Sequence, residues 1–118
     1  MALGWPLSGP PEDSVAFFRN AGSRLALYLL EGIAEEAGQT PAPAGSIRAT
    51  LAINFESRNL VDETLTLAVQ AGAQSLQPAQ DRFWGGYSGY FADPDGHARE
   101  VAYNPSWSIG EDGLPQLP

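Results

Sequence analysis

The chain of 118 residues contains no cysteine, and this absence removes several kinds of chemistry. A disulfide bridge, a thiolate metal site and a cysteine nucleophile all require a thiol. A Ser-His-Asp set would have to use His97, the single histidine, and no nucleophile-elbow motif accompanies it. The sequence also lacks a G-x-x-x-x-G-K loop, so a phosphate-cradling site is unsupported.

Basic residues are scarce as well, since six stand against fourteen acidic ones and give a formal charge of −8. Such a chain repels the phosphates of nucleic acids and the surface of anionic membranes. We therefore expect neither nucleic acid nor a membrane among its partners. The acidity itself is interpreted as a source of solubility.

Long hydrophobic runs are also missing. The longest apolar stretch, Leu25–Leu30, is far too short to cross a bilayer. The first residues, Met1–Trp5, lack the basic start and apolar core of a signal peptide, which predicts a cytoplasmic protein. What is present, 43% apolar and 17% charged residues, is an ordinary globular mixture, and the length fits a single domain.

Two segments are predicted to be helices. Leu60–Ala71 has apolar residues at helical spacing, with Ser57 or Asn59 as a cap and Gly72 at its end. A shorter helix is predicted for Glu31–Ala37, where a glycine and then two prolines follow.

The segment Ile47–Phe55 alternates as a strand does. We expect one face of it to pack beneath the long helix and the other to line an open, partly polar surface. The first set is Ile47, Ala49, Leu51, Ile53 and Phe55, and the second is Arg48, Thr50, Ala52 and Asn54.

The strongest hairpin signal joins strands Phe83–Ala92 and His97–Tyr103 through Asp93-Pro94-Asp95-Gly96, because proline, aspartate and glycine suit successive turn positions. A weaker copy joins Ser14–Arg19 to Arg24–Leu30 through Asn20-Ala21-Gly22. The chain is therefore interpreted as a duplication, with Pro41–Gly45 between the two units. A single α+β domain without duplication is the alternative.

These segments resemble a known family. The run Trp84–His97, followed by Glu100–Pro105, is similar to the closing hairpin of the vicinal oxygen chelate (VOC) superfamily, which includes glyoxalase I, bleomycin-resistance proteins and extradiol dioxygenases. The resemblance extends back through Ser23–Tyr28, Val15–Phe18 and Gly4–Leu7. It implies an α+β fold of two βαβββ modules whose curled mixed sheets surround a shared cavity. The implied divisions are a truncated first module (1–44), a second module (45–105) and a tail (106–118).

Metal-using members of this superfamily take ligands from the first and last strands of both modules. By this resemblance Glu100 occupies one such position, whereas Ala26 and Thr50 occupy two others, and the fourth lies on a strand absent from the sequence. Catalytic metal sites need about three protein ligands. We therefore expect no complete metal site and no cofactor, unless subunits complete a divalent site between them. His97 is interpreted as a turn-flanking residue.

Glu100 is the candidate catalytic residue, because on its strand it alternates with the small residues Ala98 and Ala102. Tyr87, Gly89 and Phe91 are expected to face it from the neighbouring strand. The predicted ligand-binding residues are Arg48, Thr50, Asn54, Trp84, Tyr87, Phe91 and Glu100. Glu100 would act as a general acid or base if it is unpaired in a dry pocket, help Trp84 and Tyr87 to bind a cation, or be inert if Arg48 or Thr50 pairs with it.

The leading prediction is thus a glyoxalase-like protein that binds a small molecule. The alternatives are a metal-dependent lyase or dioxygenase completed across subunits, and a structural module whose pocket is filled by side chains. One apolar face of the first hairpin is expected to lie open, which predicts a homodimer or strand-exchanged oligomer. That face would consist of Val15, Phe17, Leu25, Leu27 and Leu29.

Overall fold

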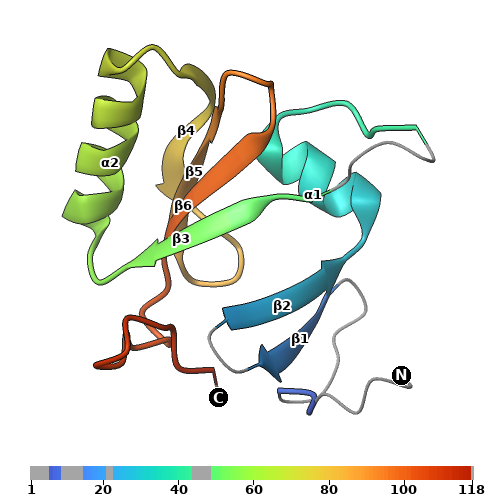
Figure 1. Ribbon diagram of the computed structural model, residues 1–118, viewed down its shortest axis with the longest axis vertical. Helices are drawn as coiled ribbons and strands as arrows, with labels where there is room; N and C mark the ends of the chain where they lie inside the picture. Colours follow the sequence, from blue (N-terminus) through green and yellow to red (C-terminus); the bar gives the residue numbers. More distant parts are fainter. Residues whose placement is uncertain (1–5, 9–14, 21–22, 44–48, 118) are drawn as a thin grey trace.

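The computed structural model describes residues 6–8, 15–20, 23–43 and 49–117. It confirms the α+β class, with two helices and two sheets within this part of the chain (Figure 1). In chain order the elements are β1 (Val15–Asn20), β2 (Ser23–Tyr28), α1 (Leu30–Ala37), β3 (Leu51–Phe55), α2 (Arg58–Gln70), β4 (Gln74–Asp81), β5 (Tyr87–Ala92) and β6 (Ala98–Tyr103).

Both predicted helices are present. Ser57 caps α2, since its side-chain oxygen accepts a hydrogen bond from the Leu60 amide at 3.2 Å. Gly38 ends α1 in the left-handed conformation at φ 70°, which a glycine adopts without a steric penalty. No helix among the described residues is both long and apolar enough to cross a membrane.

The larger sheet has the strand order β3-β6-β5-β4, with β3 parallel to β6 and the other pairs antiparallel. In Figure 1 helix α2 lies beside this sheet, and the β1–β2 hairpin lies apart from it, below β3. The hairpin contacts the C-terminal tail. Phe17 packs edge-on against Trp107 with ring centroids 5.0 Å apart, and Arg24 Nε donates to the Pro115 carbonyl at 3.1 Å.

The strand predicted for Phe83–Ala92 begins later than expected. Residues 82–86 form a tight turn, in which the Arg82 amide donates to the Gly86 carbonyl and the Gly85 amide to the Arg82 carbonyl. Gly85 has φ 91°, which favours glycine. The turn joins β5 to β4, an edge strand of the larger sheet with little hydrophobic alternation in its sequence.

The two faces of the larger sheet have different coverings. On one face α2 packs over the middle strands, where Val61 and Val101 are fully buried. On the other face Tyr90 and Ala98 form a buried cluster with Ala37 of α1. The prediction that Leu51 and Ile53 pack beneath α2 is wrong: they are 64% and 50% exposed, because α2 lies mainly over β4, β5 and β6 rather than over the edge strand β3.

The prediction of which residues form one apolar face of the first hairpin is also wrong. The register pairs Val15 with Tyr28 and Phe17 with Ala26, whereas Leu25 pairs with Phe18. Directly paired residues lie on the same side of a sheet, so Val15 and Phe17 lie on the face opposite to Leu25 and Leu27. The two sets therefore do not form one continuous patch.

The predicted homodimer stays a prediction, and exposed Leu51 and Ile53 on edge strand β3 give it a specific test. A second copy that covers this strand would bury both side chains. Ile53→Asp should then convert a dimer into a monomer in light scattering, while Leu67→Asp, a change at the similarly exposed Leu67 of α2, should not. A monodisperse wild-type monomer at micromolar concentration would contradict the prediction.

Candidate functional site

A cavity of about 1230 Å³ lies between the first hairpin and the face of the larger sheet that carries α1. Its wall includes Val15, Phe17 and Tyr28 from β1 and β2, and Ala98, Glu100 and Ala102 from β6. Small side chains from β6 and large ones from the hairpin thus line a space large enough to hold a small molecule.

Glu100 is the acidic residue that β6 presents to this cavity. Its neighbours along the same face of the strand are Ala98 and Ala102, as predicted, and both are almost completely buried. The register places Tyr90 of β5 directly opposite Glu100, with Ser88 opposite Ala102. The Ser88 and Tyr90 side chains therefore lie on the same face of the sheet as the Glu100 carboxyl.

The expectation that Tyr87, Gly89 and Phe91 face Glu100 is therefore wrong. These residues lie on the opposite face of β5, beneath α2. The Tyr87 hydroxyl donates to Asp62 Oδ1 of α2 at 2.6 Å, and the Arg58 guanidinium lies 4.5 Å from the centre of the Tyr87 ring. A Cβ atom built on Gly89 would lie 2.6 Å from a methyl carbon of Leu65 in α2.

A second carboxylate, Glu36 of α1, joins the site and was not found by the sequence analysis. The Tyr90 hydroxyl donates to Glu36 Oε2 at 2.6 Å, and the Trp84 indole Nε1 donates to Glu36 Oε1 at 3.1 Å. Tyr90 thus lies between two acids that are distant in the sequence. Trp84 also lines the cavity, as predicted.

Arg82, in the turn between β4 and β5, brings a positive charge to this cluster. Its Nε donates to Ser88 Oγ at 2.9 Å and its second nitrogen donates to the Ser88 carbonyl at 3.1 Å. Its guanidinium also lies 5.6 Å from the centre of the Tyr90 ring. Arg82 therefore holds Ser88 and lies against the ring of Tyr90.

The electrostatics of the cluster oppose ionisation of Glu100. Burial and the nearby negative charge of Glu36 raise the pKa of Glu100 to about 7, and the hydroxyl groups of Ser88 and Tyr90 together with Arg82 counteract this only in part. Burial and the charge of Glu100 also raise the pKa of Tyr90, which keeps its phenol protonated. A carboxyl group with a pKa near neutrality can give or take a proton at physiological pH.

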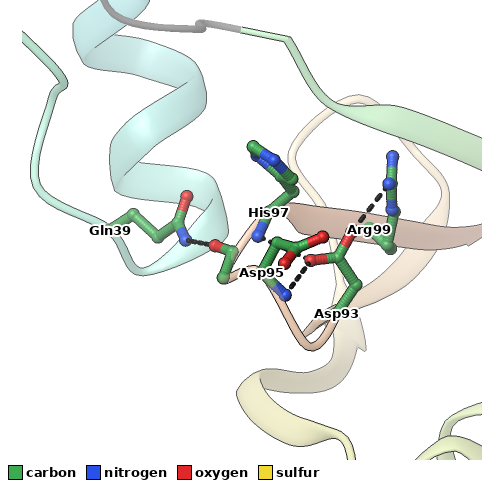
Figure 2. Close-up of polar contacts among 6 residues, drawn as sticks. Gln39, Asp93, Asp95, His97 and Arg99 are labelled. Carbon is green, nitrogen blue, oxygen red and sulfur yellow. Dashed lines mark hydrogen bonds and ion pairs between the residues drawn. The ribbon is translucent and has the colours of Figure 1, made fainter.

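The turn between β5 and β6 contacts the chain just after α1 (Figure 2). Gln39, just after α1, donates from Nε2 to the Gly96 carbonyl at 3.3 Å. Within the turn Asp93 Oδ1 accepts from the amides of Asp95 and His97, and Asp93 Oδ2 accepts from Arg99 at 2.7 Å. These bonds to Asp93 fix the shape of the turn, and Gln39 joins it to the end of the helix that carries Glu36. His97 lies beside the turn, as predicted.

A family model described as the Glyoxalase/Bleomycin resistance protein/Dioxygenase superfamily matches residues 2–101 of the chain. The chain belongs to this superfamily. A glyoxalase-related enzyme from Fulvimarina pelagi is 35% identical to it over 97% of this chain and 81% of that chain, with a TM-score of 0.57. A structure named as an NAD-dependent benzaldehyde dehydrogenase from Legionella pneumophila has a TM-score of 0.62 over 81% of this chain and 76% of that chain. At 22% identity it supports the fold alone. A search of curated proteins found no match.

Members of the superfamily that use a metal draw ligands from several strands, and the donor set here does not fit that role. Ala26 has no ligating atom, and Thr50 offers a weak ligand. Both oxygens of Glu36 already accept hydrogen bonds, from Trp84 and Tyr90. Among the residues that the structure describes, no three His, Asp or Glu side chains come close enough to hold a metal ion.

The other predicted ligand-binding residues have mixed placements. Thr50 and Asn54 line the cavity, whereas Phe91 lines a separate hollow beside α2. Arg48 lies outside the described residues, so its predicted pairing with Glu100 stays a prediction. The residues that the sequence analysis missed are Glu36, Arg82, Ser88 and Tyr90.

Proposed function

We propose that this member of the superfamily binds a small molecule in the cavity around Glu100, without a complete metal site. The observation that carries the proposal is the position of Glu100. A carboxyl group on β6, paired with Tyr90 of β5 and flanked by Ala98 and Ala102, lines a space of about 1230 Å³. A mainly apolar pocket with a few convergent polar groups is the usual form of a small-molecule site.

The apolar walls would supply most of the affinity, and Glu100 would fix the orientation of the ligand. The cavity surface that Val15, Phe17, Ala98 and Ala102 provide is largely hydrocarbon. Burial of a ligand against such a surface is favourable by about 25 cal/mol per Å² of apolar area, while polar contacts contribute specificity. The Trp84 indole at the wall should report occupancy by a change in its environment.

A fragment screen by ligand-observed NMR tests the proposal. Fragments that bind the wild-type protein should also shift the Trp84 indole signal and should bind Glu100→Ala about tenfold more weakly, because one hydrogen bond to the ligand is lost. Glu63→Gln is the matched control, since Glu63 is an exposed residue of α2 and does not line the cavity.

A metal titration distinguishes the proposal from its two alternatives. Calorimetric titration of metal-stripped protein with Ni²⁺, Zn²⁺ and Fe²⁺ should show no saturable binding. Saturable binding that Glu100→Ala abolishes would instead favour a lyase or dioxygenase site completed between subunits. If neither fragments nor metals bind, the cavity is filled in solution and the structural-module alternative holds.

A further inference from the structure

The segment that follows β6, residues 104–117, runs from one wall of the cavity to the other (Figure 1). It leaves β6 after Tyr103, and its far part is bonded to the first hairpin, since Arg24 Nε of β2 donates to the Pro115 carbonyl at 3.1 Å. Between these points Trp107 packs against Phe17 of β1, with ring centroids 5.0 Å apart and an angle of 87° between the ring planes. This segment, the tail, therefore connects β6 with the hairpin.

Hydrogen bonds within the tail give it a defined shape. Asn104 Oδ1 accepts from the Ser106 amide at 2.9 Å, and the Asn104 carbonyl accepts from the Trp107 amide at 3.0 Å. Further along the tail, the Gln116 amide donates to the Ser108 carbonyl at 2.8 Å. A segment that is already ordered loses less conformational entropy when a ligand packs against it. The tail is thus suited to form part of a binding site.

The tail supplies an uncharged part of the cavity wall. Its residues Trp107, Leu114 and Pro115 line the cavity. Its two acidic residues, Glu111 and Asp112, are exposed and do not line the cavity. The surface that the tail presents to a ligand is therefore mainly aromatic and hydrocarbon.

The charged groups that line the cavity come from other elements. Glu36 belongs to α1 and Glu100 to β6, and His97 lies just before β6. Arg24 of β2 lies beside the tail, where its Nε is bonded to the Pro115 carbonyl. A ligand can therefore place a polar group near Glu100 and an apolar ring against the tail and the hairpin.

The tail also helps to hold the two walls of the cavity in place. The hairpin and the larger sheet are separate sheets, and among the described residues no strand of one pairs with a strand of the other. The chain joins the hairpin to α1 at Leu29, and the contacts of Trp107 and Arg24 tie the hairpin to the tail. A ligand between the walls touches the hairpin and the tail together, so its binding favours the docked tail.

We propose that the tail completes the ligand site, with Trp107 as a ligand-contacting residue that packs against an uncharged apolar ring. This inference rests on the proposed function, because it assigns a further wall and a ligand class to the same cavity. The bound ligand and the docked tail stabilise each other. The factor by which the docked tail strengthens ligand binding is also the factor by which the ligand strengthens docking of the tail.

Titration with Nile red, an uncharged aromatic dye whose emission increases in apolar surroundings, tests the role of Trp107. Trp107→Ala should bind the dye about tenfold more weakly than the wild type, because the change removes apolar contact area and loosens the tail. Trp107→Phe should recover most of the affinity, since the smaller ring can keep an edge-on contact with Phe17. Ser108→Ala is the matched control, because Ser108 is exposed on the same tail and does not line the cavity.

Limited proteolysis of the wild-type protein tests the coupling by a second route. Chymotrypsin can cut after Trp107 only when this side chain leaves Phe17 and enters the protease. Saturating Nile red should slow this cut about tenfold, provided that the tail opens and closes faster than the protease cuts. Mass spectrometry identifies the cut, and a chromogenic peptide in the same solution shows that the dye does not inhibit chymotrypsin.

The outcomes separate a failure of this inference from a failure of the proposed function. Equal affinity of the wild type and Trp107→Ala for the dye, or a cut after Trp107 that bound dye does not slow, overturns the inference and leaves the cavity as a ligand site. Fragments that bind where the dye does not also overturn it. If neither the dye nor any fragment binds the wild type, the proposed function fails and the inference fails with it. Proteolysis needs only the wild type, so it decides the inference even if Trp107→Ala does not fold.

Discussion

Glu100→Gln should stabilise the protein at alkaline pH and change its stability little below about pH 4.5. The physical reason is that burial and Glu36 raise the pKa of Glu100 from 4.5 in the unfolded chain to about 7 in the folded one. Between these values the folded state binds more protons than the unfolded state, so the free energy of unfolding falls as the pH rises. Above about pH 7 Glu100 is ionised in both states, and the folded protein is destabilised by the full free energy of burying that charge.

The size of this effect follows from the shift. A change of this extent in the pKa corresponds to about 3 kcal/mol, as an upper value. Glutamine keeps the shape of the side chain and carries no charge at any pH. The variant should therefore exceed the wild type by about 2–3 kcal/mol at pH 8, and the difference should fade as the pH decreases through the window from 7 to 4.5.

Urea unfolding at a series of pH values measures the difference directly. Glu63→Gln provides the control, because Glu63 is exposed on α2 and its replacement removes the same charge from the chain. A stability difference between Glu100→Gln and the wild type that is constant from pH 4 to pH 8 would show that Glu100 ionises normally in the folded protein.

The elements that could be predicted from the sequence are those with local signals. The spacing of Val61 and Leu65, with Ser57 as a cap, predicts α2, and Gly38 marks the end of α1. The isolation of Glu100 between two alanines in β6 also follows from simple alternation. Strand β4 has no such local signal, and its pairing with β5 supplies what its own sequence does not.

The partner of Glu100 was misassigned because one residue changes the register of a hairpin. The expected turn would pair Ala92 with His97, which places Gly89 opposite Glu100. In the structure Asp93 pairs with His97, since the Asp93 amide donates to the His97 carbonyl, and Gly96 adopts φ 85°. A type I turn followed by a left-handed glycine closes a three-residue loop (94–96), one residue shorter than the expected loop of residues 93–96. This single step moves Tyr90, instead of Tyr87, to the cavity face.

The same error affects the first hairpin. The predicted turn at Asn20–Gly22 would pair Arg19 with Ser23, whereas the structure pairs Asn20 with Ser23. That step places Phe17 opposite Ala26 instead of Leu25. Glu36 was missed for a different reason: helical periodicity identifies which face of α1 is apolar, and gives no information about the strand on which that helix packs.

Tyr90→Ala should cost about 3–5 kcal/mol of stability, and Tyr90→Phe about 1–2 kcal/mol. Tyr90 is fully buried, and it packs with Ala37 of α1 and Ala98 of β6, together with Ile33 and Leu76 at the edge of the cluster. Removal of the ring leaves a cavity that joins these elements, whereas removal of the hydroxyl group leaves the packing intact. Since small domains are stable by about 5–15 kcal/mol, the alanine variant is expected to be close to unfolding at ordinary temperatures.

The phenylalanine variant separates the structural role of Tyr90 from its role in the site. Tyr87→Phe is the matched control, because it removes the same hydroxyl group from the same strand, where the bond to Asp62 is exposed and should contribute less than about 1 kcal/mol. Chemical denaturation gives the stabilities, and the Trp84 indole signal reports whether its bond to Glu36 persists. Equal losses in the two phenylalanine variants would show that the hydrogen bond from Tyr90 to Glu36 stabilises the protein no more than an exposed one does. A larger loss at Tyr90, with a changed Trp84 signal, is the result that a connected Trp84–Glu36–Tyr90 network requires.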